Sequence, residues 1–228
     1  MYGLSAKYYD AIYSFKDYKK EAAYLIDLID PSAETLLDVA CGSGKHLRSF
    51  SGRFRCSGLD LEPQFVESAR VANPDCEVFE GSFVDFELGK LFDVVTCLFS
   101  AIGYAHENLD RAMAQMAKHL NPGGTVFIEP WFQPGQFYER RLHTSTYEGE
   151  GFTIVRMNTT SIVARMSIMD MHHLIGTPDG VTHFVERHEL MLYSQEEVVS
   201  AFQQAGLAVR FDPVGPTGRG LYIGTAPI

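Results

Sequence analysis

The residues with the clearest chemical meaning are residues 36–46, which read LLDVACGSGKH. An apolar run meets Asp38, and Gly42 and Gly44 then precede a lysine. Glycines at the end of a strand let the backbone pass close to a ligand. A phosphate-binding P-loop, a dinucleotide turn and a turn that receives a nucleoside without a pyrophosphate share this appearance.

Two of these three sites require residues that the chain lacks. A P-loop needs a glycine where Val39 stands and a serine or threonine where His46 stands. A dinucleotide turn needs a third glycine where Leu47 stands. The chain also shows no second nucleotide-binding half, which disfavours an NAD-dependent oxidoreductase. The nucleoside turn is therefore the interpretation that agrees with the spacing.

Polar groups at the ends of the following strands favour the same interpretation. Asp60 ends the next predicted strand, 18 residues after Gly42, where a carboxylate can accept both ribose hydroxyls. Ser82 and Phe83 end the third predicted strand, where a polar side chain and a backbone N–H suit an adenine. We expect Asp38 to face the amino group of an amino-acid tail, directly or through water.

The elements that position these residues alternate between strand and helix. Such alternation predicts a parallel sheet with right-handed crossovers. The predicted strands cover residues 35–40, 56–61, 76–83, 92–101 and 125–130, and the predicted helices cover residues 4–29, 44–54, 63–73 and 108–120.

The pattern changes after residue 130. Branched and aromatic runs within residues 151–193, joined by the turn GTPDG, predict antiparallel strands because their connections are too short for helical crossovers. A helix over 194–206 begins with a capping box, and two edge strands, 208–213 and 220–226, follow it. The predicted fold class is α/β: a Rossmann-like, mostly parallel seven-stranded sheet with helices on both faces and an inserted antiparallel β segment.

Composition limits the classes of function. The chain has 228 residues, 46% of them hydrophobic, which suits one α/β domain with an insertion. A formal net charge of -10 disfavours nucleic acid and anionic membranes as partners and favours a small molecule. The four cysteines form no C-x-x-C pair, and neither a secretory signal nor a membrane-spanning run is visible, so we expect a cytoplasmic protein. The eight histidines lack a metal-ligand spacing, so we expect no metal.

The motifs DVACGSG, GLDL, FDVVTCLFSAIGY and LNPGG, within residues 36–130, resemble those of class I S-adenosylmethionine (SAM) methyltransferases. AKYYDAIY, IEPWF, HFVERHELMLY and GPTGRGLYIG extend the resemblance nearly end to end, to dTDP-linked 3-amino-sugar N,N-dimethyltransferases of the desosamine and mycaminose type. The resemblance implies SAM as cofactor, S-adenosylhomocysteine as product and a small amine as acceptor. It divides the chain into a SAM-binding domain, residues 1–132 and 194–228, and a substrate-cap or dimerisation segment, residues 133–193.

The resemblance assigns roles to two tyrosines, and the type and position of the other residues complete the expected site. Tyr9 is expected to face the transferred methyl group and Tyr104 to lie beside the acceptor nitrogen, as the catalytic pair. The expected cofactor-binding residues are Tyr13, Asp38, Ala40, Gly42, Gly44, Asp60, Leu61, Ser82, Phe83 and Phe99. The expected substrate-binding residues are Tyr9, Tyr104, Glu129, Trp131, His173 and Arg219.

Three positions depart from the family's pattern. The family usually has an acidic residue where Ser82 stands, an arginine where Ile168 stands and a tyrosine where His173 stands. If that arginine serves the nucleotide sugar, this chain accepts another substrate. Two alternatives therefore stay open: an O- or C-methyltransferase acting on another small molecule, and a non-catalytic SAM-binding protein. For an amine acceptor we expect catalysis by alignment, which can supply ~7–11 kcal/mol in model reactions.

Overall fold

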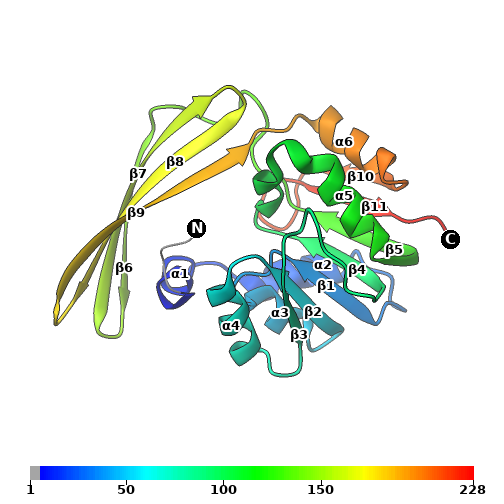
Figure 1. Ribbon diagram of the computed structural model, residues 1–228, viewed down its shortest axis with the longest axis horizontal. Helices are drawn as coiled ribbons and strands as arrows, with labels where there is room; N and C mark the ends of the chain where they lie inside the picture. Colours follow the sequence, from blue (N-terminus) through cyan, green and yellow to red (C-terminus); the bar gives the residue numbers. More distant parts are fainter. Residues whose placement is uncertain (1–5) are drawn as a thin grey trace.

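The larger of two sheets has seven strands and forms the centre of the molecule (Figure 1). The computed structural model describes residues 6–228, with side chains from Tyr8 onward. The strand order is β10-β11-β5-β4-β1-β2-β3; β1 to β5 run parallel, and β11 pairs antiparallel with β5 and β10. The strands are β1 Thr35–Val39, β2 Arg55–Asp60, β3 Glu77–Glu80, β4 Phe92–Cys97, β5 Leu120–Ile128, β10 Ala208–Asp212 and β11 Leu221–Thr225.

Helices cover both faces of this sheet, because each buries an apolar stripe on it. On one face lie α2 (Tyr18–Ile26), α3 (Lys45–Phe50) and α4 (Pro63–Ala72). On the other lie the 3-10 helix η1 (Ala101–Asn108), α5 (Leu109–Lys118) and α6 (Gln195–Gln204). The predicted fold class is therefore confirmed. The predicted capping box of α6 is also present, with Ser194 and Glu197 exchanging hydrogen bonds.

A second, four-stranded antiparallel sheet extends away from the first (Figure 1). Its strands, in the order β6-β7-β8-β9, are β6 Leu142–Gly149, β7 Phe152–Val163, β8 Met166–Thr177 and β9 Gly180–Met191. The short helix α1 (Ala6–Ile12) packs on this sheet, where Ile12 joins Phe152, Ile154 and Ile175 in a separate apolar cluster. α1 therefore connects the two sheets at the place where the site forms.

Three sequence expectations are corrected. The single helix expected over residues 4–29 is divided into α1 and α2, because the Asp17 side chain accepts from Lys20 N and starts a new helix; residues 4 and 5 lie outside the described residues. The strand expected to reach residue 101 ends at Cys97, since Phe99 and Ser100 have positive φ angles of 52° and 63°. β6 was not predicted as a separate strand.

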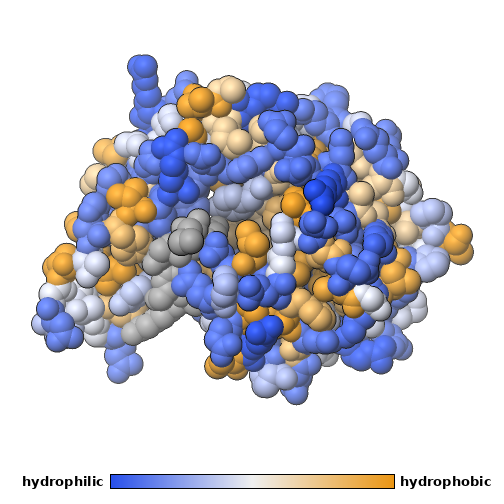
Figure 2. Space-filling view, in the orientation of Figure 1, coloured by the Kyte–Doolittle hydropathy of each residue, from blue (hydrophilic) through white to orange (hydrophobic). Residues whose placement is uncertain are grey.

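Hydrophilic and apolar residues are mixed on the face of the molecule that carries the cavity-facing helix and sheet in Figure 2. Figure 2 shows hydrophilic residues over most of one face, with apolar residues between them in small groups. Among the described residues, no helix is long and apolar enough to cross a membrane.

Candidate functional site

A cavity of about 1150 Å³ lies at the carboxyl edge of the parallel strands, where α1, the loops after the strands and the antiparallel sheet meet. Open α/β sheets bind ligands at this edge, at the point where the strand order reverses, which here is between β1 and β4. Twelve of the sixteen site residues expected from the sequence line it: Tyr9, Tyr13, Asp38, Ala40, Gly42, Asp60, Leu61, Phe83, Phe99, Tyr104, Trp131 and Arg219.

The two glycines after β1 have different surroundings. Gly42 has a φ of +55°, and a Cβ built on it would meet nothing within 4 Å, so its open side faces the cavity. Gly44 is the N-cap of α3 with a φ of +79°, and a Cβ there would lie 2.4 Å from Asn73 Nδ2. Gly44 does not line the cavity; it allows α3 to begin close to α4.

Asp38, at the end of β1, is a buried carboxylate with one oxygen left for a ligand. Oδ1 accepts a 2.7 Å hydrogen bond from Thr96 Oγ1, whereas Oδ2 has no hydrogen-bond partner among the described residues. Burial raises the pKa of Asp38 to about 6, although Thr96 and His46 oppose the increase. Buried polar atoms are nearly always paired, so this oxygen fits a cationic group such as the ammonium of an amino acid.

Asp60, at the end of β2, keeps acceptor capacity toward the cavity. Oδ2 accepts from Gly42 N at 2.7 Å and Oδ1 from Glu62 N at 3.0 Å, so the side chain also fixes the glycine turn. Burial raises the pKa of Asp60. A carboxylate has about four acceptor positions, and those left fit the two hydroxyls of a ribose.

Helix α1 covers this row and is anchored to the glycine turn. Asp10 accepts from Ser43 Oγ at 2.6 Å and pairs with Lys45 Nζ at 2.9 Å. The rings of Tyr9 and Tyr13 lie 4.6 Å apart and line the cavity. Burial raises the pKa of both hydroxyls, so they stay neutral donors near neutral pH.

A hydrogen-bonded pair that the sequence reasoning missed lies opposite α1. Tyr104 Oη is 2.6 Å from His188 Nδ1, and His188 Nε2 is 3.8 Å from Glu186 Oε2. All three residues line the cavity. The alternation of Glu186 and His188 on β9 places both on one face, and that spacing could have indicated them.

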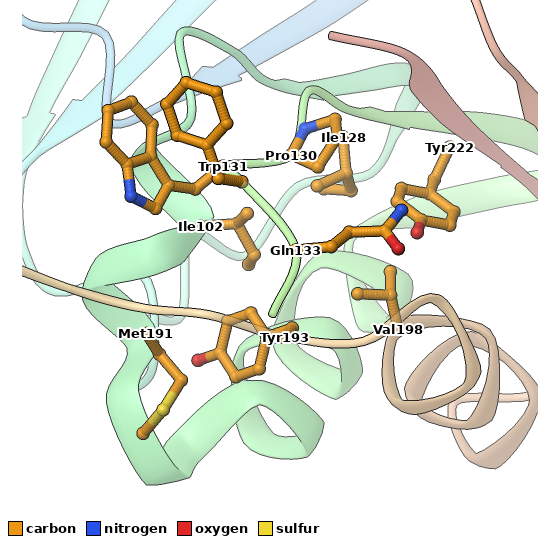
Figure 3. Close-up of a pocket in the computed structure, with 10 residues that line it drawn as sticks. Ile102, Ile128, Pro130, Trp131, Gln133, Met191, Tyr193, Val198 and Tyr222 are labelled. Atoms are coloured by element: carbon orange, nitrogen blue, oxygen red, sulfur yellow. The ribbon is translucent and has the colours of Figure 1, made fainter. Parts of the chain in front are cut away.

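Glu129 and Trp131 both follow β5, but only Trp131 lines the cavity. Glu129 is fully buried outside the cavity, where it accepts from Phe99 N at 2.6 Å and from Thr217 Oγ1, so it positions two loops. Trp131 lines the cavity and donates from Nε1 to Ser167 Oγ at 2.9 Å. Behind it lies a pocket of about 10 Å³ that also includes Tyr222 (Figure 3). This space holds one water at most, so it supports Trp131 and binds no substrate.

Arginines also line the cavity. Arg219 donates to Ser100 Oγ at 2.9 Å and lies 5.2 Å from the centre of the Trp131 ring. Arg156 donates to Tyr147 at 3.1 Å. Arg141 lines the same space, and among the described residues neither Arg141 nor Arg219 has a carboxylate within ion-pair distance. An anion can therefore bind there without displacing an existing partner.

Ser82 and His173, like Gly44 and Glu129, lie off the cavity wall. Ser82 is 3.4 Å from Val84 N, while its neighbours Gly81 and Phe83 line the cavity. His173 is 1% exposed, stacks on Phe184 and lies 3.4 Å from Glu186 Oε2. His173 thus lies behind the cavity wall, next to Glu186 and opposite Arg156 on β7, both of which line the cavity. The described residues include no cluster of three or more potential metal ligands.

Comparisons with known proteins agree with this geometry. Residues 36–124 match the family described as "Methyltransferase domain". Together with the strand order and the groups that fit an amino acid and a ribose, this match defines the class: a SAM-dependent methyltransferase.

Relatives that match over the whole length of the chain define a narrower family than the domain match does. The chain is 40% identical to dTDP-3-amino-3,6-dideoxy-alpha-D-glucopyranose N,N-dimethyltransferase of Streptomyces fradiae, over 97% of this chain and 91% of that one. The crystal structure of DesVI from Streptomyces venezuelae matches with a TM-score of 0.92 and 37% identity over 100% of both chains. SAM-bound CalS10, an amino pentose methyltransferase from Micromonospora echinaspora, matches with a TM-score of 0.87 and 34% identity over 99% of both. The chain belongs to this family of sugar N-methyltransferases.

Proposed function

We propose that the protein methylates the amino group of a dTDP-linked deoxy-amino sugar, using SAM as the methyl donor. The observation that carries the proposal is the pair of arginines, Arg141 and Arg219, that line the cavity and have no carboxylate partner within the described part of the chain, in a protein of net charge -10. They suit a diphosphate. The Streptomyces fradiae relative, which matches end to end, is named for such a substrate.

The SAM sulfonium supplies a methyl group bonded to a good leaving group. This chain's residues then have to hold the amine in line with it. In this proposal the Tyr104 hydroxyl, which contacts His188, orients the nitrogen, and Tyr9 on α1 lines the same cavity. We infer that residues 133–193 cover the acceptor, since β6 to β9 supply its outer wall. Alignment of this kind accounts for large rate increases without a strong base.

An acceptor panel tests the proposal. The purified protein is incubated with SAM and, separately, with dTDP-3-amino-3,6-dideoxyglucose, its 4-amino isomer, simple amines and phenols, and the products are weighed by mass spectrometry. We expect mass increases of 14 or 28 Da, for one or two added methyl groups, with the dTDP-amino sugars only. Methylation of a phenol with none of an amino sugar would favour an O-methyltransferase.

A further inference from the structure

Asn158 is a buried polar residue in the middle of the antiparallel sheet. It lies on β7, is 6% exposed and lines the cavity. Its neighbours Met157 and Thr159 are exposed on the other face of the strand, so the alternation of β7 directs the Asn158 side chain toward the cavity. Asparagines are seldom buried to this extent, and buried polar side chains nearly always have a hydrogen-bond partner.

The Asn158 amide has no hydrogen-bond partner within residues 8–228. Thr160, the next residue on the same face of β7, differs in this respect. Its hydroxyl donates to Tyr138 O at 2.7 Å and accepts from Arg141 N at 3.0 Å. An amide offers one oxygen that accepts and two N–H groups that donate. Asn158 therefore keeps both kinds of group for a ligand in the cavity.

Two methionines lie beside Asn158 on β8. The register places Met171 opposite Asn158 and Met169 opposite Thr160, and both methionines line the cavity. Met169 is 9% exposed, yet neither methionine joins the three apolar clusters of the described residues. A thioether adapts its shape to a ligand and is only a weak hydrogen-bond acceptor. Asn158 is thus a polar group beside an apolar surface, which suits a ligand with a hydroxyl at one position and none at the next.

The strand order places this surface between the two ends of the proposed acceptor. His188, which contacts Tyr104, lies on β9, whereas Arg141 immediately precedes β6, and β7 and β8 lie between these strands. Neighbouring strands are about 4.8 Å apart, so β6 and β9 are separated by roughly 14 Å. An acceptor with its amine at Tyr104 and its diphosphate at Arg141 therefore crosses β8 and β7 with its sugar ring.

We propose that Asn158 determines specificity by hydrogen bonding to one hydroxyl group of the acceptor's sugar ring, while Met169 and Met171 contact ring atoms that carry no hydroxyl. The inference rests on the proposed dTDP-amino sugar acceptor and adds no chemical step to the methyl transfer. A site that pairs with a substrate hydroxyl rejects the analogue that lacks it, because the buried amide then has no partner. The proposal thus predicts a preference between acceptors that depends on one residue.

Three acceptors that differ in one hydroxyl provide the test. The parent, dTDP-3-amino-3,6-dideoxyglucose, carries a hydroxyl on each side of its amine, and each of two analogues lacks one of them. In the wild type, loss of one hydroxyl should lower kcat/KM about 5- to 100-fold, and loss of the other less than about 3-fold. Asn158→Leu, which has a similar size and no hydrogen-bonding group, should lower kcat/KM for the parent by the same factor and remove the preference.

Two further variants are controls. Thr159→Val changes the next residue of β7, which is exposed on the opposite face, so kcat/KM should stay within about 2-fold of the wild type for all three acceptors. Met171→Leu conserves the volume of a neighbour of Asn158 in the cavity. It should change kcat/KM for all three acceptors by a similar factor and keep the preference.

An unchanged preference in Asn158→Leu would overturn the proposal, even if all three activities fall, because an equal loss indicates a structural role. If Asn158→Leu does not fold, Asn158→Ala decides by the same criterion. A wild type that methylates the three acceptors equally well would overturn this inference alone. A wild type that methylates none of them would overturn the proposed acceptor together with it.

Discussion

The ionisation of a single residue, Asp38, is favoured by the proposed ligand and opposed by burial. Binding an ammonium group requires its ionised form, whereas burial favours its neutral form and raises its pKa to about 6 from an ordinary 3.8. That difference corresponds to a cost of about 3 kcal/mol for the ionised carboxylate in the protein without ligand. The ionised carboxylate that the proposed site requires therefore lowers the stability of the folded protein.

The variant Asp38→Asn tests this cost of ionisation through the pH dependence of stability. The folded state holds the Asp38 proton up to about pH 6, while the unfolded chain releases it near its ordinary value. The contribution of Asp38 to stability is therefore present below the unfolded pKa and is lost as pH rises through the folded pKa. We expect the wild-type free energy of unfolding, relative to that of Asp38→Asn, to fall by up to about 3 kcal/mol between pH 4 and pH 7. Urea unfolding of both proteins at several pH values measures it.

SAM affinity should change with pH in the other direction. The carboxylate must be ionised to attract the ammonium group, so wild-type affinity should rise between pH 5 and pH 7, and Asp38→Asn should flatten that rise. Calorimetric titration at pH 5 and pH 7.5 decides the matter. A parallel pH dependence of the two proteins would mean that Asp38 does not face the ammonium group.

The contact between Tyr104 and His188 is tested by a double-mutant cycle. If His188 acts by orienting the Tyr104 hydroxyl, His188→Ala and Tyr104→Phe should each lower kcat/KM for the amine by about 3- to 30-fold, and the double variant should lose little more than either. SAM affinity should stay unchanged in all three. Steady-state kinetics and calorimetry measure both quantities. Fully additive losses would show that the two side chains act independently.

At the scale of elements, the turn between β1 and α3 contains a glycine that faces the cavity, Gly42, and a glycine that packs against α4, Gly44. Gly42→Ala should cost about 1–2 kcal/mol of stability for the positive φ and, because the methyl group enters the cavity, weaken SAM binding at least 10-fold. Gly44→Ala should cost more stability, about 2–4 kcal/mol, since its Cβ meets the Asn73 side chain, but affect binding less. Urea unfolding measures the loss of stability in both variants, and calorimetry measures the loss of SAM affinity. A larger loss of affinity in Gly44→Ala than in Gly42→Ala would contradict the assignment of Gly42 to the cavity.

Helix α1 should control how long SAM stays bound. Asp10 joins α1 to the turn through Ser43 and Lys45, so Asp10→Ala should increase the SAM dissociation rate by about 5- to 30-fold. Lys45→Ala should change it less than about 3-fold, because Lys45 is 44% exposed and exposed ion pairs contribute little. Stopped-flow displacement measures both rates. Equal effects would indicate that the Ser43 hydrogen bond is not important.

Elements with strong local patterns were predictable, and those set by tertiary contacts were not. The apolar runs of β1 and β4, Pro63 at the start of α4 and the capping box of α6 each have a local cause. The break between α1 and α2 was missed because the helical spacing continues across it. The pair of Tyr104 and His188, 84 positions apart, was missed because only β9 packing against η1 brings it together.

For the whole molecule, the cavity lining has as many lysines and arginines as carboxylates, seven of each, whereas the chain has a net charge of -10. The net charge of -10 repels anions over the surface, while Arg141 and Arg156, from neighbouring segments of the antiparallel sheet, and Arg219, from the loop before β11, line one space. A charge-balanced pocket inside an acidic surface repels a small anion that fits the pocket less than it repels a large polyanion that must contact the surface. We therefore expect the acceptor to be a small anionic molecule, as proposed above.

Arg219→Met tests this selection. It keeps the apolar contact with Trp131 but removes the charge, so KM for a dTDP-amino sugar should rise about 10- to 100-fold. kcat and SAM affinity should change less than about 3-fold, because the diphosphate lies away from the reacting atoms. Free dTDP should compete with the sugar in the wild type and lose that ability in the variant. Arg210→Met on β10 is the matched control, since Arg210 lies outside the cavity. An unchanged KM in Arg219→Met would show that Arg219 does not bind the diphosphate. Equal increases of KM in both variants would show that Arg219 acts only through the overall charge of the protein.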